Sequence, residues 1–157
     1  MAKELEYKYL VKDNSFLEMA TESYAIVQGY LSRAKGRSVR VRTFGDKAYF
    51  TVKGPNMKGI GRDEYEYEIP VSDALELLKL CPPPVLQKTR YIALHEGNRW
   101  EVDVFHGDLE GLVTAELEVP SADYEFSLPP FVGRDVSDDR RFRNSRLTTF
   151  EALKPAL

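Results

Sequence analysis

The chain has 157 residues, of which 43% are hydrophobic and 30% charged, and its formal net charge is −3. This is the length of one ordinary domain, residues 1–157, with enough apolar side chains for a core, so the composition excludes a wholly disordered chain. No apolar run approaches the roughly 20 residues that a membrane-spanning helix needs. The 25 acidic and 22 basic residues exclude a global positive field for nucleic acid.

The N-terminus and the cysteine content favour a cytoplasmic location. Residues 1–4 lack the apolar stretch of a secretory signal, and Cys81 is the only cysteine, so no internal disulfide can form. We therefore expect a cytoplasmic protein that has neither a membrane nor a nucleic acid among its partners. The sequence leaves a homodimer open.

The predicted elements are mainly short strands. Alternation of side-chain character predicts strands at residues 3–11, 25–32, 39–42, 48–53, 62–70, 86–95, 99–105 and 113–119. Two turns each join two of these strands into a hairpin, one at Gly45-Asp46 and the other at Glu96-Gly97-Asn98.

Helical signals are few and lie between or after the strands. Residues 16–23 have weak helical character, and Ser72 is a candidate cap for a helix that continues to about Leu80. From Ser121 onward the sequence predicts a wrapping segment with a short helix at about 138–152. About eight antiparallel strands with so few helices predict an α+β protein built on a barrel or a highly curved sheet.

In seven segments, charged residues occupy alternating positions, which lie on one face of a strand. These segments are Glu4-x-Glu6-x-Lys8, Arg40-x-Arg42, Thr51-x-Lys53, Arg62-x-Glu64-x-Glu66-x-Glu68, Lys88-x-Arg90, Glu101-x-Asp103 and Glu116-x-Glu118. A solvated strand face is the ordinary explanation for any one of them. Several strands, however, carry charges of one sign, and the opposite faces are aromatic and aliphatic. We therefore expect the apolar faces to point outward under a cover, and the charged faces to surround a water-filled lumen.

A lumen of this kind suits a chain of phosphates. Arginine and lysine bind phosphate oxygens, whereas the glutamates would repel phosphates unless a divalent metal lay between them. Oxygen-only ligands favour Mg²⁺ or Mn²⁺. Arg62 and Glu68 lie at the two ends of the charged segment 62–68 and are expected in solvent. We expect one of two positions for three arginines of the C-terminal segment, which either close the lumen or lie on the surface of that segment: Arg134, Arg141 and Arg143.

The ordered motifs resemble those of the CYTH superfamily, the triphosphate tunnel metalloenzymes, and in particular its short prokaryotic inorganic triphosphatases. The resemblance covers about residues 3–120 and rests on Glu4-Leu5-Glu6-Tyr7-Lys8, Arg40-Val41-Arg42, Thr51-Val52-Lys53-Gly54, Arg62-Asp63-Glu64-Tyr65-Glu66, Lys88-Thr89-Arg90-Tyr91, Trp100-Glu101-Val102-Asp103 and Ala115-Glu116-Leu117-Glu118. It implies a closed eight-stranded antiparallel barrel, or tunnel, with helices packed on the outside, that binds a small-molecule triphosphate with Mg²⁺ or Mn²⁺.

The resemblance also implies roles for individual residues. The implied metal ligands are Glu4, Glu6, Glu116 and Glu118, and the implied phosphate-binding residues are Lys8, Arg40, Arg42, Lys53, Lys88 and Arg90. The catalytic candidates are Glu6, Lys8, Lys88 and Glu116. Four further acids bind a second metal, orient water or pair with neighbouring bases: Glu64, Glu66, Glu101 and Asp103.

The leading functional hypothesis is metal-dependent hydrolysis of inorganic triphosphate to pyrophosphate and phosphate. Two alternatives remain open at this point. One is a nucleoside or thiamine triphosphatase, or an adenylate cyclase of class IV type. The other is a polyphosphate- or nucleotide-binding module without catalytic activity.

Overall fold

A computed structural model describes residues 2–56 and 61–157, without the side chains of residues 2–4 and 56. The strands are β1 (Ala2–Val11), β2 (Ala20–Ala34), β3 (Arg37–Phe44), β4 (Lys47–Asn56), β5 (Gly61–Ile69), β6 (Leu86–His95), β7 (Asn98–Phe105), β8 (Val113–Glu118) and β9 (Val132–Asp135). The α-helices are α1 (Phe16–Met19), α2 (Val71–Leu80) and α3 (Phe150–Leu153). Within the described ranges, none of the helices has the length and apolar character needed to cross a membrane.

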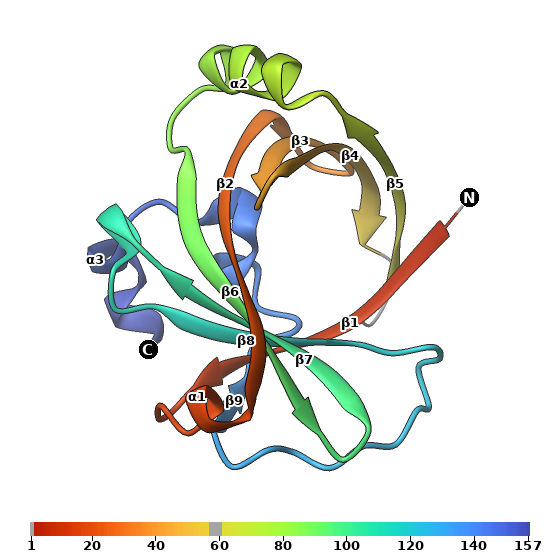
Figure 1. The fold of residues 1–157 in the computed structure, drawn as a ribbon, viewed down its shortest axis with the longest axis vertical. Helices are drawn as coiled ribbons and strands as arrows, with labels where there is room; N and C mark the ends of the chain where they lie inside the picture. The colour runs from red at the N-terminus through yellow and green to blue at the C-terminus, as the bar shows by residue number, and fades with distance from the viewer. Residues whose placement is uncertain (1, 57–60) are drawn as a thin grey trace.

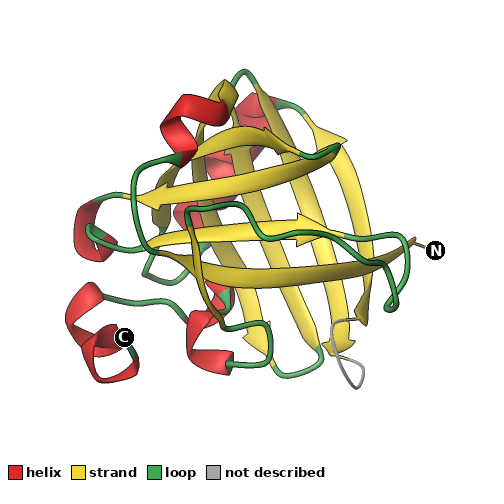
Figure 2. Cartoon of the chain, turned by 90° about the horizontal axis from the view of Figure 1, so that it is seen from below, coloured by secondary structure: helices red, strands yellow, loops and turns green. Residues whose placement is uncertain are grey.

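Eight strands close into a barrel in the order β1-β5-β4-β3-β2-β6-β7-β8, and every neighbouring pair is antiparallel (Figure 1). Strand β1 closes the ring by pairing with β5 through Ala2–Leu5 and with β8 through Glu6–Leu10. Strand β9 pairs with the end of β1 through Tyr9 and Val11. The barrel predicted from the sequence is confirmed, and Figure 2 shows its long strands from the side.

The strand register places the charged residues on the inner face of the barrel wall and the apolar residues on its outer face, as their alternation in the sequence predicts. Residues opposite each other in neighbouring strands share a face, so the pairing of Arg40 with Thr51 and of Thr51 with Glu66 puts all three inside. On the outside, Trp100 and Leu117 are buried against Phe131 of the segment that follows β8. Covering these side chains removes apolar surface from water, which leaves the charged face turned inward.

Helix α2 covers another part of the outer wall. Ala74 of the helix packs against Val41 of β3 and Ala48 of β4, and all three are fully buried. Figure 1 shows the helix outside the ring, beside β2, β3 and β4. Because the helix buries the outer side of this wall, Arg40 and Arg42 on the intervening inner positions face the lumen.

The C-terminal segment, residues 136–147, closes one end of the barrel. Leu86 of β6 and Phe105 of β7 lie on the inner face at this end, and they pack with Val136, Phe142 and Leu147 in one apolar cluster, which we call the end plug. In Figure 1 this part of the chain passes behind the ring of strands. The inner face of the barrel is therefore apolar at this end and polar elsewhere.

Two helix predictions were wrong in extent. The helix expected at 16–23 ends at Met19, because β2 begins at Ala20 and pairs there with Ala93 of β6. The helix expected at 138–152 is replaced by 3₁₀ turns at Arg140–Phe142 and Asn144–Arg146 followed by α3. The Asp139 side chain accepts a hydrogen bond from the Arg141 backbone amide, and such local bonds compete with a continuous helix.

The end plug predicts a stability effect. Phe142 is fully buried, so Phe142→Ala should lower the free energy of unfolding by about 3–5 kcal/mol through lost burial and a residual cavity. Urea unfolding measures this change. Leu80→Ala is the control, because Leu80 is 70% exposed and should cost about 0.5 kcal/mol or less. Equal losses for the two variants would contradict the packing described for the plug.

Candidate active site

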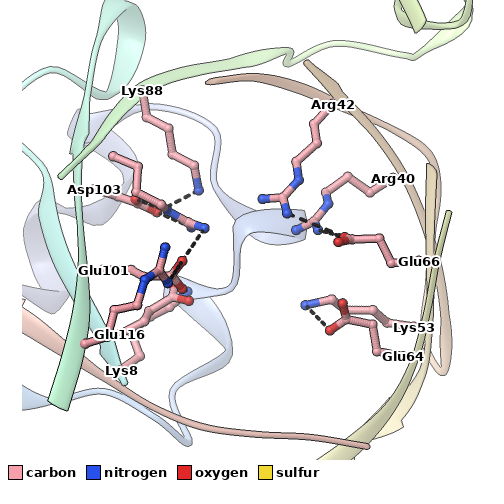
Figure 3. Close-up of polar contacts among 12 residues, drawn as sticks. Lys8, Arg40, Arg42, Lys53, Glu64, Glu66, Lys88, Glu101, Asp103 and Glu116 are labelled. Carbon is pink, nitrogen blue, oxygen red and sulfur yellow. Dashed lines mark hydrogen bonds and ion pairs between the residues drawn. The ribbon is translucent and has the colours of Figure 1, made fainter. Parts of the chain in front are cut away.

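The barrel encloses a cavity of about 210 Å³ whose lining is almost entirely charged. Its lining residues come from seven strands and the C-terminal segment: Glu6, Arg40, Arg42, Lys53, Glu64, Glu66, Arg90, Glu101, Glu116, Glu118 and Asn144. Figure 3 shows two groups of side chains that face each other across this space. We call the group on β3, β4 and β5 the first wall and the group on β1, β6, β7 and β8 the second wall.

On the first wall, one carboxylate serves two arginines. Glu66 Oε2 lies 3.4 Å from Arg40 Nη2 and 3.5 Å from Arg42 Nη2, and it accepts a 2.8 Å hydrogen bond from the Thr51 hydroxyl. Burial, and repulsion from Arg40 and Arg90, lower the pKa of Arg42 to about 10. Lys53 Nζ lies 3.8 Å from Glu64 Oε2, also on this wall.

On the second wall, Asp103 holds two bases. Its carboxylate accepts a bidentate pair of hydrogen bonds from Arg90, at 2.8 and 2.9 Å, and a 2.7 Å bond from Lys88 Nζ. The side chains of Asp103 and Lys88 are 1% and 0% exposed. Burial acts to raise the pKa of Asp103, but the charges of Arg90 and Lys88 outweigh it and hold this pKa well below its usual value. Arg90 Nη1 also donates to Glu101 at 3.2 Å, which directs the guanidinium toward the cavity.

Lys8 and Glu116 lie where the second wall meets the C-terminal segment. Lys8 Nζ lies 3.3 Å from Glu116 Oε1 and donates a 3.0 Å hydrogen bond to the Phe142 carbonyl. Burial opposes the charge on Lys8, but Glu116 and Glu6 more than offset this effect and raise the pKa of Lys8. Lys8 also favours the charged form of Glu116, whose pKa is lowered although burial acts to raise it. Both groups are therefore charged at neutral pH.

Three buried polar atoms of this site have no hydrogen-bond partner among the described residues: Arg40 Nε, Arg42 Nε and Glu116 Oε1. The ion pair between Lys8 and Glu116 does not satisfy Oε1 with a hydrogen bond. Unsatisfied buried donors and acceptors are costly, and such groups are normally completed by water or a ligand. Two guanidinium donors suit anionic oxygens, and a carboxylate oxygen suits a cation or a water proton.

Most residues predicted from the sequence meet in this cavity. Lys8 lines a smaller adjoining cavity of about 70 Å³. Glu118 lines the main cavity from the exposed end of β8. The side chain of Glu4 is outside the described residues. Lys88 and Asp103 are both buried behind the lining, where Asp103 pairs with Lys88 and with Arg90, the pairing with neighbouring bases that was one of the alternatives for Asp103. An unpaired buried charge would be expensive, which explains why they pair here.

Sequence reasoning missed Asn144, which lines both the main cavity and the adjoining one. It lies in the 3₁₀ turn Asn144–Arg146, where neither strand alternation nor helical periodicity applies. Thr51 was recognisable as an inward residue, because it precedes Lys53 by two positions.

The donor chemistry of the cavity fits a hard divalent cation. Glu6, Glu116 and Glu118 bring carboxylate oxygens to its lining, and Glu116 Oε1 is buried without a hydrogen bond. Within the part of the chain that is described, no three acidic, histidine or cysteine side chains are gathered as a ready cation cage. Mg²⁺ commonly binds one or two carboxylates and completes its shell with water and substrate phosphates.

Comparison with known proteins gives a consistent picture. A family model described as CYTH domain matches residues 2–151. The chain is 48% identical to a protein of Acetivibrio thermocellus named inorganic triphosphatase, over 94% of each chain. It is 33% identical to a protein of Nitrosomonas europaea with the same name, over 92% of this chain and 95% of that one. A crystal structure of an inorganic triphosphatase superposes with a TM-score of 0.67 at 31% identity, covering 94% of this chain and 95% of that chain.

The buried position of Asp103 predicts a pH-dependent loss of stability. Asp103→Asn leaves Lys88 and Arg90 without their shared charge, so at pH 7 the free energy of unfolding should fall by about 3–5 kcal/mol. The folded-state pKa of Asp103 lies below its unfolded value of about 3.9, so its stabilisation is present above that pH and is lost as the pH falls through the folded-state pKa.

Urea unfolding of wild type and Asp103→Asn at several pH values checks this prediction. The gap between them should be widest near pH 7 and should narrow as the pH is lowered below about 4. The exposed turn residue Asp46 supplies the control, since Asp46→Asn should change stability by about 0.5 kcal/mol or less. A gap that stays constant over the whole pH range would show that the charge of Asp103 is not the stabilising feature.

Proposed function

Because the chain belongs to the CYTH family, and because its cavity sets buried bases on two walls opposite each other, we propose that it hydrolyses inorganic triphosphate to pyrophosphate and phosphate. The observation that carries the proposal is the pair of unbonded guanidinium donors, Arg40 Nε and Arg42 Nε, at the edge of a charged cavity. Residues 1–157 are proposed to act as one tunnel domain. The names of the two curated relatives support inorganic triphosphate as the substrate.

In this proposal the two walls hold the phosphate chain from opposite sides. Arg40, Arg42 and Lys53 would bind it from the first wall, and Arg90 and Lys8 from the second. Each of these bases now contacts a carboxylate, so the arriving phosphates exchange one anionic partner for another. Lys88 is assigned an indirect role, because it supports Asp103 and thereby the orientation of Arg90. Such preorganisation is the main source of rate in phosphoryl transfer.

The acids have two proposed roles. Glu6, Glu116 and Glu118, with Glu4, would hold Mg²⁺ or Mn²⁺, which when bound neutralises phosphate charge and favours attack on phosphorus. Glu116 Oε1 would also accept a proton from the attacking water, since it is the buried acceptor left without a hydrogen bond. The water oxygen forms a bond to the terminal phosphorus as the bond to the bridging oxygen breaks, and pyrophosphate leaves. Glu64, Glu66, Glu101 and Asp103 would hold the bases in place through ion pairs.

A substrate panel tests the reaction class. Purified protein with Mg²⁺ or Mn²⁺ should release phosphate from inorganic triphosphate faster than from ATP or thiamine triphosphate, and removal of metal by a chelator should abolish turnover. Faster turnover of ATP or thiamine triphosphate would indicate a nucleoside or thiamine triphosphatase instead. Formation of a cyclic nucleotide would indicate an adenylate cyclase. Tight triphosphate binding by calorimetry without any hydrolysis would identify a binding module and contradict the proposal.

A charge-neutral substitution tests the proposed role of Glu116. Glu116→Gln keeps the size of the side chain and removes its charge, so kcat for triphosphate should fall about 100-fold or more if this carboxylate takes the proton or holds the metal. The matched control is Glu151→Gln, because the Glu151 side chain is 80% exposed in α3 and its change should leave kcat within about twofold. Thermal unfolding must show both variants folded. A Glu116→Gln protein with wild-type kcat would exclude both roles.

A further inference from the structure

A second basic cavity of about 110 Å³ lies outside the barrel, at the plugged end. It is bounded by the β2–β3 turn, the start of β5 and the C-terminal segment. Its arginines are Arg33, Arg37, Arg62, Arg140, Arg143 and Arg146, and we call it the arginine pocket. The lining also holds Lys35 and two serines, but no acidic residue among the residues described. Its volume suits a small anion.

The arginine pocket differs from the tunnel in charge compensation. Each base that lines the tunnel has a carboxylate within 4.0 Å, as Arg40 has in Glu66 and Lys53 in Glu64. In the described part of the chain, the guanidinium groups of Arg62 and Arg143 have no such ion pair. The same holds there for Arg37, Arg140 and Arg146. The positive charges of Arg62, Arg140 and Arg146 therefore act on Arg143, and the charge of Asp138 opposes them only in part.

Two observations show that this repulsion acts on Arg62 and Arg143. Arg62 Nε is buried without a hydrogen-bond partner among the described residues, while Arg62 Nη2 donates only a long 3.4 Å bond to Ser38. Burial lowers the pKa of Arg143, and the neighbouring charges of Arg62, Arg140 and Arg146 lower it further. Arg62 is half-buried, so the expectation that it lies in solvent is wrong. Two guanidinium groups with unsatisfied bonding capacity form a cradle for an oxyanion.

The small cavity of about 70 Å³ lies between the arginine pocket and the tunnel, since it shares lining residues with each of them. Arg62, Arg143 and Ser38 line both the small cavity and the arginine pocket. Arg40 and Lys53 line both the small cavity and the tunnel. A series of basic side chains therefore leads from the inside of the barrel past the end plug to the surface.

We propose that the arginine pocket is a second anion site that takes the pyrophosphate released from the tunnel. The identity of this anion rests on the proposed function, whereas the existence of the site rests on the uncompensated arginines alone. Tunnel bases regain a carboxylate partner when an anion leaves, whereas Arg62 and Arg143, which have no ion pair among the described residues, gain a close counter-charge when an anion arrives. This difference in compensation favours transfer of the anion from the tunnel to the pocket.

Calorimetric titration with inorganic pyrophosphate, without added metal, tests the site independently of hydrolysis. The wild type should bind two equivalents per chain, one in the tunnel and one in the arginine pocket. The double variant Arg62→Gln and Arg143→Gln should bind one. Arg141→Gln is the matched control, because it removes one arginine charge from the same segment, but Arg141 is exposed and already paired with Asp139 at 2.6 Å. It should still bind two equivalents.

Three results would overturn the proposal: one equivalent in the wild type, two in the double variant, or no binding at all by the folded double variant. If the double variant does not fold, the exposed Arg146→Gln replaces it and should weaken binding of the second equivalent about tenfold or more, because one charged hydrogen-bond donor to the anion is lost. Unchanged affinity in that variant would also overturn the proposal. A chain that binds two equivalents but hydrolyses no triphosphate would retain the second site and lose only the proposed function.

Discussion

The carboxylate of Asp103 lies between Lys88 and Arg90, and all three side chains are almost removed from water. An ion in such a place is tolerated only when it is paired, because its lost hydration must be offset by a partner of opposite sign. The strand register provides this partner, because Arg90 of β6 is paired directly with Asp103 of β7. The same rule recurs on the first wall, where β3, β4 and β5 bring two arginines to Glu66. Ion pairs therefore determine where each cavity base can lie.

This pairing also explains how a highly charged lumen can form before a ligand arrives. The carboxylates of Glu64, Glu66 and Glu101 form ion pairs with the cavity bases, and these pairs hold the basic side chains in place. Among the described residues of this cavity, the buried polar atoms without a hydrogen bond are Arg40 Nε, Arg42 Nε and Glu116 Oε1. The plugged end limits the lumen on one side through Phe142 and its neighbours. A phosphate chain would thus enter a site whose polar groups need little reorganisation, which is the condition for electrostatic catalysis.

Strand alternation was sufficient to predict the barrel wall and most of the cavity lining, because side-chain direction in a strand depends only on parity. Inward residues such as Glu6, Arg40 and Glu116 follow from that rule. It could not predict how deep each residue lies, and Lys88 is buried behind Asp103 although it has the same parity as Arg90. The C-terminal segment was predicted poorly, since its path is set by packing of Phe142 into the plug, and Asn144 and Arg143 reach their cavities only through that packing.

The central claim is that phosphates displace the carboxylate partners of bases on two opposite walls. A crystal structure with imidotriphosphate, which resists hydrolysis, and Mn²⁺ tests it most directly. The account predicts the phosphate chain inside the barrel, within hydrogen-bond distance of Arg40 and Arg90, with Mn²⁺ identified by its anomalous signal beside Glu116. An analogue bound only outside the barrel, or bound by one wall while the opposite ion pairs stay unchanged, would contradict it.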